Sequence, residues 1–538
     1  MTSSSSRRPS GSSSSGQPRA KRAERPASSA HRTGRAASGR AAPGQARPGQ
    51  AEPRQGAQRQ AIHLAPDSLG FALDQAAQAV GAVRAGAALP AALTSAFAAL
   101  PHDFTAMARG AVQDIAYRTM RRLGTVDWLI KQRVSKAPPP PVTNLLACAL
   151  ALVVDDEAHA AYTPFTVVDQ AVHAIGARRE VAFAKGLVNA VLRGFLRERE
   201  SALAAAQADE VARWNYPQWW IDAIRRAWPD RWQSILETGN VQGPLTLRVN
   251  ARRASAADYV QRLAAENIAA TRIGEHAVRL AVPLPVDRIP GFMAGDVSVQ
   301  DAGAQIAAQI MDVRDGMRVL DACAAPGGKS GHLLELADID LIALESDATR
   351  AARIGENFER LGFSADLADD DEQQSARHAR VVIGDAGAPA NWFDGEPFDR
   401  ILADVPCSAS GIVRRHPDIR WLRRQSDIET LAQEQRRIVE ALWALVKPGG
   451  ELLYVTCSIF PEEGEAQASW FERTHADAVR LDAPGQLLPA ADGAPAGGPE
   501  SGAASVARPD ADRQHDARPV PDRTADHDGF FYARFQKR

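Results

Sequence analysis

The stretch "VLDACAAPGGKSGHLLELA" (residues 319–337) decides the fold of the C-terminal half of the chain. A short apolar run ends at Asp321, a loop of small residues carries two glycines and a lysine, and an apolar helical pattern follows. This order predicts a strand, a nucleotide-binding loop and a helix. The loop is not a P-loop, because Cys323 stands where that motif needs a glycine, and it lacks the three spaced glycines of the dinucleotide fingerprint. It therefore lacks the full set of groups that grip a pyrophosphate.

Strands and helices alternate from residue 316 onward, which predicts a doubly wound parallel sheet with helices on both faces. Ligands bind such sheets beyond the carboxyl ends of the strands. Five chemically notable residues fall at those ends: Asp321, Glu345, Asp385, Asp404 and Cys457. The sequence therefore predicts one active site in a Rossmann-like α/β domain that spans residues 301–538.

Two smaller domains are predicted ahead of this one. Residues 61–205 are rich in Ala, Leu and Val at helical spacing, which predicts an all-α bundle. Residues 206–300 combine a Trp-rich helical segment with a strand, helix, strand pattern, which predicts a small α/β connecting domain. We expect Trp214, Trp219 and Trp220 to pack in a core rather than to stack on bases.

Basic residues recur on one side of the predicted bundle and could form a nucleic-acid face, although composition alone favours an ordinary solvated surface. The residues concerned are Arg109, Arg118, Arg121, Arg122, Lys131, Arg133, Arg178, Arg179, Lys185 and Arg193.

Residues 1–60 hold twelve Lys or Arg residues against two acids, in a chain whose formal net charge is −2. Large apolar residues are almost absent, so we predict a disordered basic tail. Such a tail either adds non-specific phosphate contacts or is a solvated spacer. Its composition also fits a transit peptide, although no amphipathic stripe supports that. A Gly/Ala/Pro/Asp-rich insert at 488–526 is likewise predicted to be disordered, before "GFFYARFQK" returns as a final strand.

Composition excludes several classes of protein. The chain has no signal-peptide core and no apolar stretch long enough to span a membrane. Its four cysteines, Cys148, Cys323, Cys407 and Cys457, are too few for a disulfide framework and have no zinc-site spacing. We therefore expect a cytoplasmic protein with no metal and no membrane partner. Cys148 lies in the helical pattern and is expected to be buried and inert.

The acids at the strand ends favour one cofactor. Glu345 closes the second strand, where an acid binds a ribose diol because a carboxylate accepts two hydroxyl protons. A fixed negative charge is awkward beside a phosphate but suits a cationic sulfonium nucleoside, which favours S-adenosylmethionine over NAD or ATP. Asp385 sits where an acid could accept from the adenine amino group.

Two thiols fall in polar, turn-rich loops at the same edge. Cys407 follows Asp404 in "ADVPCSASG", and Cys457 follows the next strand in "YVTCSIFPEE". Thiols in such places are candidate nucleophiles. Beside a methyl donor they suggest methylation of pyrimidine C5, which reacts once a thiolate has added to C6, with Asp404 stabilising the charge near N3 or N4. Amine methylation normally uses Asn or Asp, two prolines and an aromatic ring, and "DVPC" lacks that ring. These arguments leave open which thiol attacks.

Three blocks, "DACAAPGGKS", "DVPCSASGIVRRHPDIRW" and "YVTCSIFPEE", resemble the signature motifs of the Sun-type family of RNA cytosine-C5 methyltransferases. The resemblance covers about residues 65–487 and 527–538. The helical segment with "KGLVNAVLRGF" is similar to the NusB-type RNA-binding domain fused ahead of the bacterial family member. Two mild departures touch no reacting group: Glu345 replaces a more usual Asp, and Val405 a usual Ala.

The resemblance implies a role for each site residue. Cys457 would be the nucleophile, and Cys407 would assist release of the methylated product. The residues that would bind S-adenosylmethionine are Cys323, Ala324, Ala325, Pro326, Gly327, Gly328, Lys329, Glu345, Asp385 and Asp404.

The favoured interpretation is a monomeric enzyme that makes 5-methylcytosine in 16S ribosomal RNA. One alternative is an RNA-binding or antitermination-type factor with a vestigial catalytic domain, against which the intact Cys407, Cys457 and Lys329 argue. Another is the same chemistry on transfer RNA, which the catalytic domain does not exclude.

Overall fold

The computed structural model describes residues 64–98, 100, 105–155, 161–363, 365–367, 379–490 and 526–538. The predicted tail at 1–60, and residues 491–525 of the predicted insert, lie outside the described residues.

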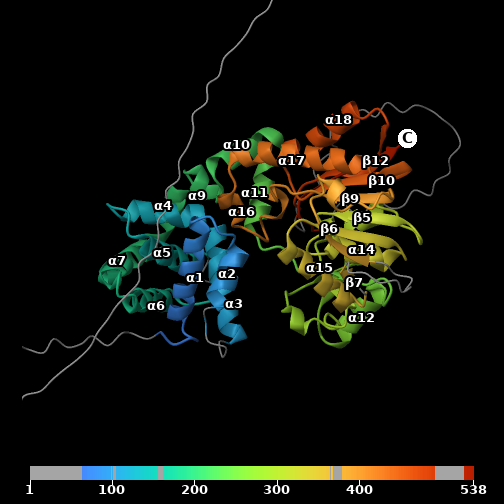
Figure 1. The fold of residues 1–538 in the computed structure, drawn as a ribbon. Coiled ribbons are helices and arrows are strands. Elements are labelled where there is room, and N and C mark those ends of the chain that lie inside the picture. Colours follow the sequence, from blue (N-terminus) through green and yellow to red (C-terminus); the bar gives the residue numbers. More distant parts are fainter. Residues whose placement is uncertain are drawn as a thin grey trace, which may run out of the picture. The chain divides into compact units, whose positions relative to one another are not determined.

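The N-terminal region is helical (Figure 1). Its α-helices are α1 (Leu69–Arg84), α2 (Leu89–Ala98), α3 (Ala106–Arg121), α4 (Leu123–Arg133), α5 (Pro140–Val153), α6 (Pro164–Ala177), α7 (Lys185–Arg197) and α8 (Arg199–Ala206). Local sequence explains where several begin. The side chains of Ser68, Thr105 and Thr163 accept backbone N–H bonds at the starts of α1, α3 and α6, as good N-caps do. A proline opens α5, where its missing N–H costs nothing.

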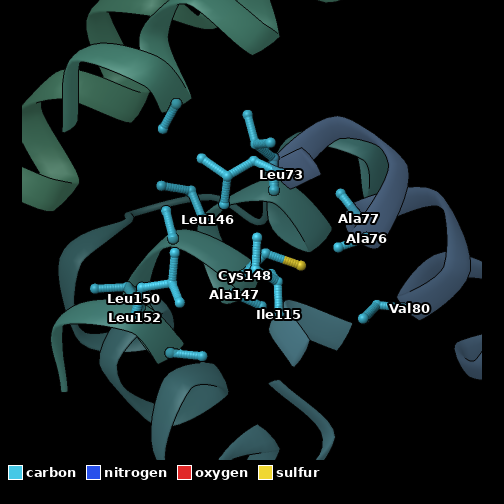
Figure 2. Close-up of a cluster of buried hydrophobic side chains, with 14 of the residues drawn as sticks. Leu73, Ala76, Ala77, Val80, Ile115, Leu146, Ala147, Cys148, Leu150 and Leu152 are labelled. Atoms are coloured by element: carbon cyan, nitrogen blue, oxygen red, sulfur yellow. The ribbon is translucent and has the colours of Figure 1, made fainter. Parts of the chain in front are cut away.

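Helix α5 forms the centre of this region. Every residue from Asn144 to Val153 is buried, as expected of a helix that is apolar all round. Figure 2 shows Cys148 among Leu73, Ala76 and Ile115 of the neighbouring helices. The Cys148 side chain is fully buried, and burial raises the pKa of its thiol to about 12. The predicted burial of Cys148 is confirmed, and its inertness stays a prediction.

Three shorter helices follow: α9 (Glu210–Trp214), α10 (Gln218–Ala227) and α11 (Trp232–Asn240). Trp214 and Trp220 are buried here, and Trp219 packs beside them, so the expected packing role of the tryptophans is confirmed. The same core takes in Ile459 and Phe460. The Trp-rich segment thus supports the loop that follows Cys457.

A small antiparallel sheet comes next, with strand order β2-β3-β1-β4. Its elements are β1 (Thr246–Val249), α12 (Ala256–Ala265), β2 (Ala270–Arg272), β3 (Ala277–Leu280) and β4 (Val297–Val299). The predicted strand, helix, strand order is confirmed for β1, α12 and β2. Strands β3 and β4 were not predicted.

The large sheet has strand order β11-β12-β10-β9-β5-β6-β8-β7. Its strands are β5 (Arg318–Ala322), β6 (Asp340–Glu345), β7 (Ala365–Leu367), β8 (Ala379–Ile383), β9 (Phe398–Asp404), β10 (Val446–Thr456), β11 (Ala478–Leu487) and β12 (Phe530–Lys537). The flanking helices are α13 (Ala302–Ile310), α14 (Gly328–Leu336), α15 (Ala348–Leu361), α16 (Ile419–Leu422), α17 (Gln425–Trp443) and α18 (Glu465–Thr474).

Helices cover both faces of this sheet, as predicted (Figure 1). Along β5, Val319 faces the core formed with α13, α14 and α15, whereas Leu320 faces the core formed with α17 and α18. This alternation is the period of two expected of a strand buried on both sides.

The prediction of an all-parallel sheet is wrong at one edge. The final strand β12 is present as expected, but it pairs antiparallel with both β10 and β11. A parallel neighbour needs a crossover connection, usually a helix. The segment between β11 and β12 has no apolar helical pattern, so the sequence offers no such crossover. The sheet is therefore mixed.

Candidate active site

The loop Cys323–Gly327 joins β5 to α14 at the carboxyl edge of the large sheet. Cys323 and Gly327 both have positive φ, of 63° and 89°. A Cβ on Gly327 would lie 3.2 Å from the Cα of Ile354 on α15, so glycine is required there. The Ala324 N–H donates to the Leu344 carbonyl on β6 at 2.9 Å. The loop is therefore held tightly between two neighbouring elements.

Glu345 ends β6 and lies beneath this loop, as predicted from its strand-end position. Its carboxylate is buried and accepts from the backbone N–H groups of Ala325, at 3.3 Å, and Asp347, at 3.1 Å. Arg350 of α15 reaches the same carboxylate at 3.4 Å and also donates to the Ala325 carbonyl at 3.3 Å. The Pro326 carbonyl accepts from Asn357 of α15 at 2.7 Å. Glu345 and α15 together fix the shape of the loop.

A buried arginine supports the loop from the small antiparallel sheet. Arg248 of β1 donates to the Gly328 carbonyl at 2.6 Å and forms an ion pair with Glu335 of α14 at 2.7 Å. Both side chains of the pair are almost fully buried. This contact was not predicted, because a strand pattern reveals nothing about a partner far along the chain.

Lys329 and Asp404 form an ion pair, with 2.5 Å between Nζ and the carboxylate. Burial lowers the pKa of Lys329, but the charge and hydrogen bond of Asp404, with a smaller contribution from Cys457, outweigh it and leave this pKa raised. The ammonium therefore stays charged between Asp404 and the thiol site. Nearby, burial raises the pKa of Asp321 to about 7, and Ser330 donates to its carboxylate at 2.5 Å.

Asp385 lies two residues beyond β8, and its carboxylate is partly exposed. It accepts from the Gly387 N–H at 2.8 Å and from Arg437 of α17 at 2.9 Å. The hydrogen bond from Arg437 is the largest cause of the lowered pKa of Asp385. The sequence placed Asp385 at the correct edge but missed Arg437.

The two thiols predicted to share a face are in contact. The Sγ atoms of Cys407 and Cys457 lie 3.4 Å apart, although they come from loops after different strands. The hydrogen bond with Cys457, followed by burial, raises the pKa of the Cys407 thiol well above its ordinary value. Burial also raises the pKa of Cys323, with further contributions from Asp404 and Glu345. Cys323 and Cys407 are thus held as neutral thiols at neutral pH.

The sequence left open whether the basic residues of the helical region form a nucleic-acid face or an ordinary solvated surface, and the structure pairs several of them within the fold. Arg118 and Arg122 pair with Asp155, and Arg178 pairs with Asp74. Arg121 donates to the Arg414 carbonyl at 3.0 Å. These four cations are used within the fold, so they offer less to an external phosphate.

Among the residues that the structure describes, no group of three or more His, Cys, Asp or Glu could hold a metal ion. No helix in the described part of the chain is long and apolar enough to cross a bilayer.

Comparisons with known proteins agree with this architecture. Residues 308–536 match the family model described as 16S rRNA methyltransferase RsmB/F. Residues 216–287 match the ferredoxin-like domain of the RsmF/B-like methyltransferases. Ribosomal RNA small subunit methyltransferase B of Cronobacter sakazakii is 38% identical over 393 residues, covering 72% of this chain and 86% of the relative. The chain therefore belongs to the RsmB family of 16S rRNA methyltransferases.

Other relatives support the same assignment. The Pectobacterium carotovorum protein of the same name is 39% identical over 397 residues, covering 72% of this chain and 88% of the relative. The crystal structure of PH0851 has the same fold, with a TM-score of 0.64 at 24% identity, over 88% of this chain and 100% of that one. The resemblance noted in the three sequence blocks is therefore confirmed. Both family models begin after residue 205, so the NusB type of the helical region stays a prediction.

Proposed function

We propose that this chain methylates C5 of a cytosine in 16S ribosomal RNA, using S-adenosylmethionine. The observation that carries the proposal is the contact between Cys407 and Cys457 beside the Lys329–Asp404 ion pair. Methylation at C5 is the reaction that needs a nucleophile at the adjacent ring carbon, and few other methylations need a thiol. The names of the relatives support small-subunit ribosomal RNA as the substrate.

The residues at the loop fit the cofactor. The Cys323–Gly327 turn is compact, since the Gly327 N–H donates to the Ala324 carbonyl at 2.7 Å. Glu345, Asp385 and Asp404 each lie at or just beyond the end of a strand, at the same edge of the sheet as this loop. Glu345 would bind the ribose hydroxyls and Asp385 the adenine amino group, while the acidic rim suits a cationic sulfonium. Bound here, S-adenosylmethionine would supply an electrophilic methyl group.

The protein's part in the chemistry begins with the Cys457 thiolate, which adds to C6 of the cytosine and forms a C–S bond. The ring electrons move toward C5, which becomes enamine-like and accepts the methyl group. Asp404 stabilises the ring near N3 or N4, and Lys329 lowers the cost of the thiolate charge nearby. Loss of the C5 proton to a base then returns electrons to the ring and expels the Cys457 thiolate. Cys407, held as a neutral thiol, assists this release.

The same chemistry on transfer RNA is the second candidate, because the catalytic domain does not exclude it. Bisulfite sequencing of ribosomal and transfer RNA from cells with and without this gene separates the two. We expect one cytosine of 16S ribosomal RNA to lose its protection when the gene is deleted. If a cytosine loses its protection only in transfer RNA, transfer RNA replaces 16S ribosomal RNA as the proposed substrate. If no cytosine loses its protection in either RNA, the alternative with a vestigial catalytic domain is favoured.

A further inference from the structure

One carboxylate, that of Glu463, joins the two loops that carry the thiols. From the Cys407 loop, the Ser408 N–H donates to Glu463 at 2.8 Å and the Ser408 hydroxyl donates at 2.5 Å. From the Cys457 loop, the Ser458 hydroxyl donates to the same carboxylate at 2.6 Å. The serines that follow the two thiols, Ser408 and Ser458, therefore both donate to the carboxylate of Glu463.

The long helix α17 completes this arrangement. The amide of Gln435 donates to Glu463 at 3.2 Å and to the Pro406 carbonyl at 3.0 Å. Tyr454 of β10 lies within hydrogen-bond distance of both Gln435, at 2.9 Å, and the Glu463 carbonyl, at 2.8 Å. Backbone and side chain of Glu463 are thus fixed by the helix, the strand and both loops.

A carboxylate in this position is costly for stability. Glu463 is fully buried, and no lysine or arginine lies among its hydrogen-bond donors in the described structure. Burial raises the pKa of Glu463, while the hydrogen bonds from Ser408 and Ser458 lower it. Apolar side chains of similar volume often stabilise a core at least as well as buried charge does. What an apolar residue could not do is accept three hydrogen bonds from two separate loops and a fourth from helix α17.

We propose that Glu463 is a positioning residue, which holds the Cys407 and Cys457 loops together so that both thiols reach the same pyrimidine ring. The inference rests on the proposed function for its meaning in catalysis, but the juxtaposition of the loops stands on its own. Because Glu463 is fully buried, we assign it a role that acts through Ser408 and Ser458.

Thiol cross-linking measures this geometry without any turnover. Diamide takes two electrons and two protons from a pair of thiols in contact and leaves a disulfide, and peptide mapping identifies the Cys407–Cys457 link. We expect the full-length wild-type protein to form this link readily, because the sulfurs are 3.4 Å apart. Glu463→Ala should form it about tenfold more slowly, the factor that corresponds to about 1.4 kcal/mol. Glu463→Gln should recover most of the rate, since the amide keeps the length and an acceptor oxygen.

Controls separate positioning from general damage. Glu462→Ala, at the exposed neighbouring position, should cross-link at the wild-type rate. Ser408→Ala removes one of the donors and should slow cross-linking by about threefold. If Glu463→Ala does not fold, the cross-linking rate of Ser408→Ala tests the proposal instead. A wild-type cross-linking rate in folded Glu463→Ala, or in Ser408→Ala when Glu463→Ala does not fold, would overturn the proposal.

Steady-state kinetics on 16S ribosomal RNA gives the second readout. Glu463→Ala should lower kcat with little change in KM for S-adenosylmethionine, and Glu463→Gln should restore much of kcat. Equal losses in kcat for both variants would contradict positioning by shape and hydrogen bonding. If the wild-type protein methylates no cytosine but the cross-linking differences persist, the proposed function fails while the joining of the loops by Glu463 stands.

Discussion

The helical region and the large sheet each hold cysteine, but they surround it differently. Cys148 lies among apolar side chains of α1, α3 and α5, where burial outweighs Thr119 and Arg84 and raises the pKa of its thiol. Cys407 and Cys457 lie in contact with each other at strand ends, beside an ammonium and several carboxylates. The comparison teaches that the reactivity of a thiol depends on which charges and donors the fold brings to it.

Removing each active-site thiol should produce the largest effect. Cys457→Ala cannot activate C5, so methylation should fall by more than about 10³-fold and no covalent complex should form. Cys407→Ala should still attack and accept the methyl group but release slowly, so a protein–RNA adduct should accumulate. Incubation with RNA and S-adenosylmethionine, followed by denaturing gel electrophoresis, measures both. An adduct from Cys457→Ala and none from Cys407→Ala would exchange the two roles.

The buried carboxyl group of Asp321 should make the free energy of unfolding depend on pH. Burial raises the pKa of Asp321 from 3.8 to about 7. Between these values the folded protein binds a proton that the unfolded chain has lost, so stability should fall as pH rises. The contribution is at most about 4 kcal/mol. Asp321→Asn should remove this slope, and urea unfolding of both proteins at several pH values measures it. Parallel pH profiles would contradict the buried, titrating carboxyl.

Much of the catalytic edge was predictable from sequence. The alternation of strands and helices placed Glu345 and Asp404 at strand ends and both thiols on one face, because parallel strands end at the same edge. The antiparallel entry of β12 was not predicted. Neither was the pair of Arg248 with Glu335, which joins residues far apart in the sequence. Such contacts depend on tertiary packing, which local periodicity does not record.

Glu463 illustrates the same limit within a motif. The block "YVTCSIFPEE" resembles a family motif over its whole length, and its cysteine is the proposed nucleophile. Its buried glutamate acquires meaning only when Ser408, from a different loop, is seen to donate to it. The motif therefore located the predicted site, while the structure revealed the hydrogen bonds by which Glu463 joins the two loops.

Cofactor affinity should depend on Glu345 to a smaller extent than turnover depends on the thiols. Glu345→Ala removes the acceptor proposed for the ribose hydroxyls and leaves the Ala325 N–H without its partner. We expect binding of S-adenosylmethionine to weaken by about 1–3 kcal/mol, measured by calorimetry. Glu356→Ala, at an exposed position of the neighbouring helix α15, is the matched control and should bind as the wild type does. Unchanged affinity in folded Glu345→Ala would remove Glu345 from the cofactor site.

The smallest effect should come from Cys148, the buried thiol of the helical region. Cys148→Ala removes one buried sulfur and leaves a small cavity among the side chains of α1 and α5, so unfolding should become easier by about 1 kcal/mol. Methylation and cofactor binding should not change, because no residue of the catalytic edge belongs to that core.

Iodoacetamide labelling with peptide mapping extends the test. In the folded protein it should modify Cys457 while sparing Cys148, whose burial raises its pKa to about 12 and excludes the reagent. Rapid labelling of Cys148, or loss of methylation in a stable Cys148→Ala protein, would contradict the expected difference in reactivity between Cys148 and Cys457.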